Sequence, residues 1–413
     1  MQPPYAPDLS EDEKIAGLSK LWAEAKFNFI HFDKVPALDW DALYLGYLPK
    51  VRATTSTLEY YRVLSAFYAE LKDGHTGVWG PRELLRDMRA KPLVQTALVE
   101  SRVLVTRVMD PKAMAAGVTV GLEILQVDGQ PVAERATRDI VPYTSASTPQ
   151  DLQARVYGWS LLEGPIAKPV ALTLRDASGA TRRAALERHE STEYWQAIRS
   201  EPMSFRMLPG NIAYVALNTF DDDKTADLFV AAFAEISKAD AIVFDLRENG
   251  GGNSGVGYRI LACLADKPFL GSAWRTRDYR PAFRAWGRRE GVFAGEPDTV
   301  APDTVHHYGR PVVVLASPRT YSAAEDFLVA FRAIGRGRIV GEPSGGSTGQ
   351  PLSFPLPGGG GARVCTKHDT YGDGTEFVGV GVAPDRLVRP TIADVRAGRD
   401  SALEAAMAEL SHR

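Results

Sequence analysis

The chain has 413 residues, a length that predicts two to three domains of ordinary size. A composition of 45% apolar and 24% charged residues is typical of globular proteins and excludes collagenous, coiled-coil and mostly disordered chains. The 48 basic and 51 acidic side chains leave a net charge of −3, which indicates neither nucleic-acid binding nor a polybasic membrane surface. No apolar run approaches the ~18 residues of a membrane span, and two cysteines, Cys263 and Cys365, are too few for a disulfide scaffold or a zinc ribbon.

The opening residues, MQPPYAPDLSEDEK, are polar and acidic and lack the basic and apolar regions of a secretory signal. Two interpretations stay open at this point. The protein is cytoplasmic, or it is exported and its signal has been removed.

The first predicted region, 1–91, is helical. Ser10 followed by three acidic residues is typical of a helix start, and apolar residues then recur at helical spacing. A second helical stretch begins with a cap at Ser56 and ends near Gly74.

The second predicted region, 92–190, consists of short apolar strands. The turn around Asp128 and Gly129 follows an alternating strand and indicates a hairpin. Residues 190–208 carry little periodicity and are expected to be a linker.

The third predicted region, 191–413, alternates strands and helices, which implies an α/β layer structure with a mainly parallel sheet. Sheets of this kind place their sites in loops at the carboxyl ends of strands. The expected strands are 211–220, 239–247, 310–317 and 337–342, and the expected helices are 225–239, 255–265 and 322–335.

The first loop that could carry chemistry is DLRENGGGNSG, after the strand that ends near Asp245. Its three glycines leave backbone N–H groups uncovered by side chains, and such donors can hold an oxyanion. Taken alone, the glycine cluster is a weak signal that favours a plain turn. The loop lacks the Lys-Ser/Thr ending of a phosphate-binding loop, which excludes an NTPase.

The second loop, SPRTYSAAEDF, places Ser322 where a strand turns into a helix. The serine could cap that helix, with Glu325 completing a capping box. It could also be a nucleophile, because a helix N-terminus stabilises negative charge on a nearby substrate oxygen.

A serine hydroxyl needs a neighbour that takes its proton. His75 lies in a loop just beyond the end of a helix and is the first candidate, and His368 is a secondary one. His31, flanked by apolar residues, is expected to be a core histidine. No pair of histidines has metal-ligand spacing with nearby acids, so no metal site is predicted.

Four motifs, DGHT, DLRENGGG, TYSAAEDF and GVGVAPD, occur in this order over most of the chain. Together they resemble the C-terminal processing (tail-specific) serine peptidase family, in the branch of the tricorn protease core and the retinoid-binding-protein repeats. The resemblance implies a multi-domain α/β protein with a helical N-terminal region, a PDZ-like β-rich domain and a crotonase/ClpP-like α/β core. The segment AAGVTVGLEILQVDGQPV is similar to the PDZ signature, although Leu122 stands where aspartate is common.

The resemblance also implies roles for single residues. Ser322 matches the family nucleophile, and the N–H groups of Gly251 and Ala323 match the oxyanion donors, with Gly252 as the alternative to Gly251. One branch of the family uses a lysine base in a G-K-G stretch after the serine. Here that stretch reads VGEPSGGSTGQP and has no lysine, and Lys367 lies too far along the chain. The other branch uses the histidine of the D-x-H-T/S motif, which is His75 here.

The histidine branch orients its base with a glutamate shortly before the G-V-x-P-D signature. Glu376, nine residues before Asp385, matches it. Some members carry the acid where this chain has Val378, and Asp373 is the reserve. Asp245 and Arg247 match the family's D-L-R element, which we expect to support the glycine loop.

The resemblance therefore implies a serine endopeptidase acting on protein or peptide substrates, with recognition of C-terminal tails through the PDZ-like domain. It implies no metal and no organic cofactor, and it leaves the oligomeric state open. It favours export over a cytoplasmic location. Two other classes remain: a non-catalytic protein that binds peptides or hydrophobic ligands on the same fold, and a crotonase-like acyl-CoA enzyme.

Overall fold

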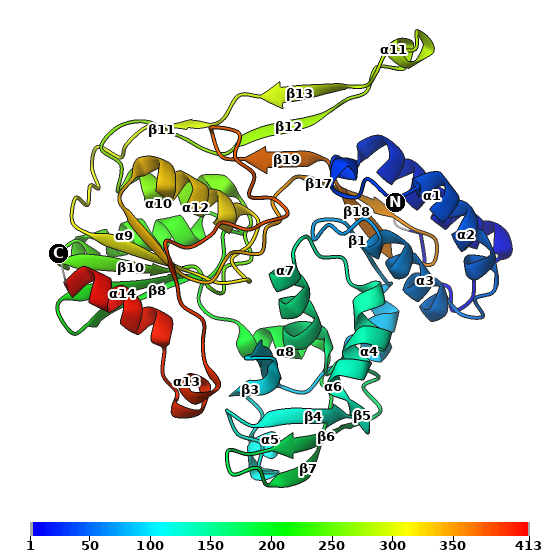
Figure 1. Cartoon of the computed structure of the whole chain (residues 1–413), viewed down its shortest axis with the longest axis horizontal. Helices are drawn as coiled ribbons and strands as arrows, with labels where there is room; N and C mark the ends of the chain where they lie inside the picture. Colours follow the sequence, from blue (N-terminus) through cyan, green and yellow to red (C-terminus); the bar gives the residue numbers. More distant parts are fainter. Residues whose placement is uncertain (1–2, 412–413) are drawn as a thin grey trace. The chain divides into compact units, whose positions relative to one another are not determined.

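The computed structural model describes residues 3–411 and divides into two compact units (Figure 1). Unit 1 comprises Met1–Arg199, Gln350–Thr366 and Thr391–Arg399, and unit 2 comprises Ser200–Gly349, Lys367–Pro390 and Asp400–Arg413. Among the described residues, no helix is both long and apolar enough to cross a membrane.

Unit 1 begins with the predicted helices. A side chain caps each of the first three, and Ser10 with Glu13 forms a complete capping box. Their facing sides bury a dense aromatic cluster in which Trp40 stacks on Phe67 at 4.4 Å. The helices and short 3₁₀ turns of this part are α1 (Glu11–Asn28), η1 (Phe32–Lys34), α2 (Trp40–Arg52), α3 (Thr57–Ala69), η2 (Arg82–Leu84) and α4 (Leu85–Met88).

A three-stranded antiparallel sheet completes the core of these helices. Its central strand pairs with one strand from the N-terminal region and with the strand that directly precedes it in the sequence, and apolar residues of the sheet join the aromatic cluster. The sequence places 350–366 in the third region, whereas the structure assigns this segment to unit 1, because its apolar face is buried against the N-terminal helices. The strands are β1 (Gly77–Trp79), β17 (Pro351–Pro355) and β18 (Gly361–Cys365), in the order β1-β18-β17.

The rest of unit 1 contains a second antiparallel sheet with its own apolar core. The predicted hairpin is confirmed: Asp128 and Gly129 have φ of 51° and 80° between two paired strands. Leu122 is buried in this core. The strands are β2 (Val94–Val99), β3 (Arg102–Val108), β4 (Glu123–Val127), β5 (Gln130–Pro131), β6 (Val170–Arg175) and β7 (Thr181–Leu186), in the order β2-β3-β4-β6-β7 with β5 beside β4.

Helical segments cover this sheet. Two of them, Ala136–Ile140 and Ala154–Ser160, are π-helical. The predicted linker 190–208 is wrong, because these residues form one helix of unit 1 and one strand of unit 2. The α-helices and 3₁₀ turns of the remainder of unit 1 are α5 (Pro111–Ala115), α6 (Val132–Arg135), η4 (Val141–Tyr143), α7 (Pro149–Gln153), α8 (Ser191–Ile198) and α13 (Ile392–Ala397).

Unit 2 contains the predicted parallel sheet. Its strands pair in parallel except at one edge, where β8 runs antiparallel to β9. The central strands are buried throughout, as expected of strands covered on both faces. The strands are β8 (Met203–Leu208), β9 (Ile212–Leu217), β10 (Ala241–Asp245), β15 (Val312–Ala316), β16 (Gly337–Gly341) and β20 (Arg386–Leu387), in the order β20-β16-β15-β10-β9-β8.

Helices cover both faces of this sheet and make three layers within unit 2 (Figure 1). One apolar cluster includes the three helices predicted from sequence, and the second includes alanines of the C-terminal helix. The α/β fold class is therefore confirmed. These helices are α9 (Lys224–Ile236), α10 (Ser254–Ala262), α12 (Ala323–Ile334) and α14 (Ser401–Ser411).

Short strands complete unit 2 outside the main sheet. They form one two-stranded and one three-stranded antiparallel sheet, the latter in the order β13-β12-β19. The elements are β11 (Phe269–Leu270), β12 (Ala273–Asp278), α11 (Pro281–Ala285), β13 (Gly291–Gly295), β14 (Thr299–Val300) and β19 (Lys367–Thr370).

Candidate active site

The two loops singled out in the sequence follow neighbouring strands of the unit 2 sheet. The glycine loop comes after β10, and the segment with Ser322 comes after β15. Strands β10 and β15 pair in parallel, with Asp245 opposite Leu315. Because both strands end at the same edge of the sheet, the two loops meet there.

Asn249 joins these loops. Its backbone carbonyl accepts a hydrogen bond from the N–H of Tyr321 at 3.0 Å. Its buried amide donates to the carbonyl of Leu217 at 3.0 Å, and its Oδ1 accepts the N–H of Gly251 at 2.9 Å. The sequence does not mark Asn249 as a functional residue, since an asparagine before glycines is also an ordinary turn signal.

Ser322 has an unusual backbone for a residue that precedes a helix. Its φ and ψ are 55° and −127°, whereas Ser10 and Ser56, which cap other helices, have extended backbones. A non-glycine residue in such a conformation costs about 1–3 kcal/mol and persists only where the surroundings enforce it. Strain of this kind at a strand-to-helix turn is typical of a nucleophile and not of a simple cap.

The buried carboxyl group of Glu325 ties the backbone of Ser322 to the loop after β16. It accepts hydrogen bonds from the N–H of Ser322 at 3.2 Å, the hydroxyl of Ser344 at 2.6 Å, and the N–H groups of Gly346 and Ser347 at 2.7 and 2.9 Å. Burial raises the pKa of Glu325 to about 7, although these donors act to lower it. The predicted pairing of Glu325 with the Ser322 backbone is thus present.

Glycine is required at two positions of the glycine loop. Gly251 and Gly252 have φ of 99° and 134°, and a Cβ on Gly252 would lie 2.2 Å from the carbonyl of Phe220. A Cβ on Gly251 would meet the backbone of Tyr321 and Ala323 at 2.7 and 2.9 Å. The loop therefore lies directly against the start of α12.

The D-L-R element supports this loop as expected. The guanidinium of Arg247 donates to both oxygens of Asp245 at 2.6 to 3.1 Å and to both oxygens of Asp400 at 2.8 Å. The backbone carbonyl of Arg247 accepts the hydroxyl of Ser317, which ties the start of the glycine loop to the segment that leads to Ser322.

His75 lies in unit 1, on the loop between α3 and β1, as predicted. It is buried, and burial lowers its pKa to about 3. Both neighbouring residues are anchored: the N–H of Gly74 donates to Ser147 Oγ at 2.9 Å, and the hydroxyl of Thr76 donates to Asp73 Oδ2 at 2.6 Å. The imidazole is therefore neutral near pH 7 and sits on a firmly held loop.

A polar cavity of about 400 Å³ in unit 1 borders the His75 loop. Gly74 and Thr76 line it, together with aromatic side chains and Glu163. Burial lowers the pKa of the cavity's lysine, Lys91, to about 8. The cavity contains one acidic side chain and four basic ones, Arg89, Lys91, Arg155 and Arg363.

Glu376 lies in unit 2 beside His368. Its carboxylate oxygens are 3.0 and 2.8 Å from Nε2 of that buried histidine, and 3.9 Å from the guanidinium of Arg275. The structure thus brings Glu376 to a histidine other than His75. The pairing of Glu376 with His75 stays a prediction.

Lys367, the lysine considered as an alternative base, lies 2.8 Å from the buried Asp369. Burial acts to lower the pKa of Lys367, but the carboxylates of Asp369 and Asp326 outweigh it and raise the pKa above its ordinary value. A lysine that stays protonated is a poor acceptor for a serine proton.

A strained serine at the start of a helix, beside a glycine loop at the carboxyl edge of a parallel sheet, has the geometry of a nucleophilic hydrolase site. Residues 211–388 match the model of peptidase family S41. The resemblance predicted from the four motifs is therefore confirmed.

Curated relatives match part of the chain. The chloroplastic C-terminal processing peptidase of Tetradesmus obliquus is 27% identical over 183 residues, which cover 44% of this chain and 36% of that protein. The chloroplastic carboxyl-terminal-processing peptidase 2 of Arabidopsis thaliana is 26% identical over 234 residues, 54% of this chain and 41% of that protein. The matched part thus spans less than half the length of these relatives.

Solved structures share the fold over nearly the whole chain. Mature CPAF complexed with lactacystin aligns with a TM-score of 0.74 at 16% identity, covering 96% of this chain and 97% of that chain. The photosystem II D1 C-terminal processing protease aligns with a TM-score of 0.55 at 23% identity, covering 91% and 93%. The tricorn protease aligns with a TM-score of 0.52 at 15% identity, covering 97% of this chain and 37% of that chain.

Proposed function

We propose that the protein is a serine endopeptidase with Ser322 as its nucleophile. The observation that carries the proposal is the strained backbone of Ser322, held at the start of α12 against a loop that only glycine can form. The relatives named as C-terminal processing peptidases support the reaction class.

In this mechanism Ser322 Oγ attacks the scissile carbonyl while His75 accepts the hydroxyl proton. His75 later returns that proton to the leaving amine, and water repeats the sequence on the acyl-enzyme. The neutral ring can accept a proton, but with a pKa of about 3 it is a weak base, so the mechanism requires the pKa of His75 to rise when substrate binds. The mechanism requires an approach of about 3 Å between the imidazole and the hydroxyl during turnover.

The oxyanion of the tetrahedral intermediate would take hydrogen bonds from Ala323 and from Gly251 or Gly252, each worth about 3 kcal/mol. The N–H of Gly251 donates to Asn249 in this structure, so Gly251 serves only if it shares that hydrogen atom or releases Asn249. The N-terminus of α12 adds a favourable dipole.

We propose Glu376 as the acid that orients His75, in competition with its present partner His368. Replacing Glu376 by glutamine should lower kcat about 10- to 1,000-fold if it positions the base. Replacing His368 by glutamine should lower kcat less than about 10-fold, because the side chain is only a partner of the acid. Full activity of Glu376→Gln would assign Glu376 to His368 alone.

The substrates proposed are protein or peptide chains with accessible C-terminal tails. The cluster of basic side chains in the unit 1 cavity supports this choice, since a terminal carboxylate is an anion of suitable size. The β-rich part of unit 1, proposed as PDZ-like, offers edge strands β2 and β7 for an added peptide strand. A tail with an amidated C-terminus should then be cleaved less efficiently than the same tail with a free carboxylate.

The central experiment measures hydrolysis of casein and of a tailed peptide by the wild type and by Ser322→Ala, His75→Ala and Lys367→Ala. We expect activity to vanish in the first two variants and to persist in the third. A fluorophosphonate probe should label the wild type and leave Ser322→Ala unlabelled. A folded wild-type chain that neither cleaves nor reacts would favour the non-catalytic binding protein.

A further inference from the structure

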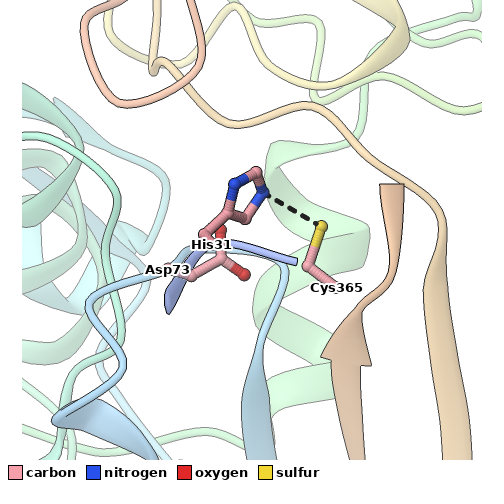
Figure 2. A group of neighbouring side chains, drawn as sticks. All are labelled: His31, Asp73 and Cys365. Atoms are coloured by element: carbon pink, nitrogen blue, oxygen red, sulfur yellow. Dashed lines mark hydrogen bonds between the residues drawn. The ribbon is translucent and has the colours of Figure 1, made fainter. Parts of the chain in front are cut away.

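Three buried side chains from distant parts of the sequence converge inside unit 1 (Figure 2). His31 precedes η1, Asp73 lies on the loop after α3, and Cys365 ends β18. Their exposed fractions are 2%, 3% and 0%, and their nearest ligand atoms all lie within 4.8 Å of one another. Among residues 3–411, this group of histidine, cysteine and carboxylate side chains alone has such spacing.

Hydrogen bonds that use none of the three ligand side chains hold these segments together. The N–H of Ile30 donates to the carbonyl of Cys365 at 3.2 Å, and the N–H of Cys365 donates to Thr76 Oγ1 at 3.0 Å. The N–H of Thr76 in turn donates to the backbone carbonyl of Asp73 at 3.2 Å. The three functional groups are therefore placed before any ligand arrives, which lowers the ordering cost of binding.

The spacing suits a metal ion of the zinc class. His31 Nε2 and Cys365 Sγ are 3.6 Å apart, and Figure 2 shows the ring nitrogen directed at the sulfur. Zinc–sulfur and zinc–nitrogen bonds of about 2.3 and 2.1 Å at a tetrahedral angle also separate the two ligand atoms by about 3.6 Å. A thiolate, an imidazole and a carboxylate are all ordinary zinc ligands.

We propose that His31, Asp73 and Cys365 bind one divalent cation of the zinc class. Neutral His31 supplies Nε2, Asp73 supplies a carboxylate oxygen, and the thiol of Cys365 releases its proton to solvent as the sulfur binds the metal. Water completes four-coordination, as it does in other sites with three protein ligands. The dication balances the two anions formed in this buried place.

The metal would hold the loop that carries His75 in place. It links β18 and the end of α1 to Asp73, two residues before His75. Asp73 stays anchored by Thr76 and by the hydroxyl of Ser147 at 3.2 Å, so it has outer partners of the kind that orient metal ligands. All three ligands belong to unit 1, and the role proposed for the metal is to hold the loop that carries His75.

The test uses the full chain, unfolded with a chelator present and refolded with Zn²⁺, with Co²⁺, or with no metal. After desalting, we expect one metal ion per chain and a higher melting temperature in the metal-refolded samples. The Co²⁺ form should show tetrahedral d–d bands and thiolate-to-cobalt charge-transfer absorption.

The matched control is Cys263→Ala, which removes the chain's other buried cysteine. It should retain the metal and the charge-transfer band. Replacing a residue that only hydrogen-bonds to a metal ligand typically lowers metal affinity about 10- to 100-fold. Cys365→Ala and His31→Gln remove a ligand itself, so each should lower metal affinity by more than this.

Two outcomes overturn the proposal. In the first, the refolded wild type takes up no metal and its melting temperature does not change. In the second, Cys365→Ala keeps the metal content of the wild type. If Cys365→Ala fails to fold, the charge-transfer band of Co²⁺-loaded Cys263→Ala decides, because Cys365 is then the one cysteine left to produce it. None of these readouts depends on peptidase activity.

Discussion

A Cβ atom on Gly251 would lie 2.6 Å from the Cβ of Ser322. This approach makes the backbone of the glycine loop one wall of the proposed site, so Gly251→Ala should push the loop away from the start of α12. We expect a loss of at least about 100-fold in kcat/KM, because oxyanion donors displaced by a fraction of an ångström lose most of their effect. Kinetic measurements with a tailed peptide check this expectation.

The adjacent Gly250→Ala is the matched control. Its Cβ would meet no atom within 4 Å. Activity should stay within about threefold of the wild type. Equal losses in both variants would show that the loop tolerates no side chain for reasons other than its contact with Ser322.

Because the backbone of Ser322 is strained, glycine should be more stabilising than alanine at position 322 and less stabilising than alanine inside a regular helix. Both Ser322→Gly and Ser322→Ala should be inactive, but Ser322→Gly should be more stable by about 1 kcal/mol, because glycine adopts a φ of 55° without strain. At Ser65, inside α3, glycine should instead be less stable than alanine by about 1 kcal/mol. Urea unfolding of the four variants measures both differences. Equal free energies of unfolding for Ser322→Gly and Ser322→Ala would mean that the backbone at position 322 is not strained.

The buried carboxyl group of Glu325 should make the free energy of unfolding depend on pH. Its pKa is about 7 when folded and near 4.5 when unfolded, so between these values the folded state holds a proton that the unfolded state has released. The contribution of Glu325 to the free energy of unfolding therefore falls as pH rises through this window, by about 3 kcal/mol in all.

Glu325→Gln removes this titration. The free energy of unfolding of the wild type, minus that of the variant, should decrease between about pH 4 and about pH 8. Urea unfolding at a series of pH values provides the measurement. A difference that is constant, or that grows with pH, would mean that the carboxyl group is ionised throughout, held by its hydrogen-bond donors.

The ion pairs of Arg247 predict a large structural effect. Removing this side chain leaves Asp245, which is 8% exposed, without its cationic partner. Arg247→Ala should lower the free energy of unfolding by about 3 kcal/mol or more. The control Arg259→Ala breaks two exposed ion pairs, with Asp223 and Asp227, and should cost less than about 1 kcal/mol. Similar losses in the two variants would contradict a buried supporting role for Arg247.

Local patterns in the sequence were sufficient for much of the fold. Helix caps such as Ser10 and Ser56, the Asp128–Gly129 turn and the alternation of strands and helices in the core all depend on neighbours within a few residues. The linker prediction for 190–208 failed for the complementary reason. The residues of β8 become a strand by pairing with β9, and that partner cannot be read from the weak pattern of β8 itself.

In the candidate site, too, some residues could be recognised from local sequence and others could not. Ser322 and the glycine loop were recognisable because each motif is contiguous, and their proximity followed from adjacent parallel strands. The pairing of Glu376 with His368 and the linking role of Asn249 were not recognisable. Both depend on which loops approach each other across the fold, and no local pattern records that.

The sequence by itself therefore determined the α/β class, the resemblance of the core to peptidase family S41 and the residues that carry its motifs. Tertiary structure decided that 350–366 packs with the N-terminal helices, and that His31, Asp73 and Cys365 become neighbours although hundreds of residues separate the first from the last. The physical reason is the range of the forces involved. Turns, caps and periodicity act between residues close in sequence, whereas burial of an apolar face selects its partner from the whole chain.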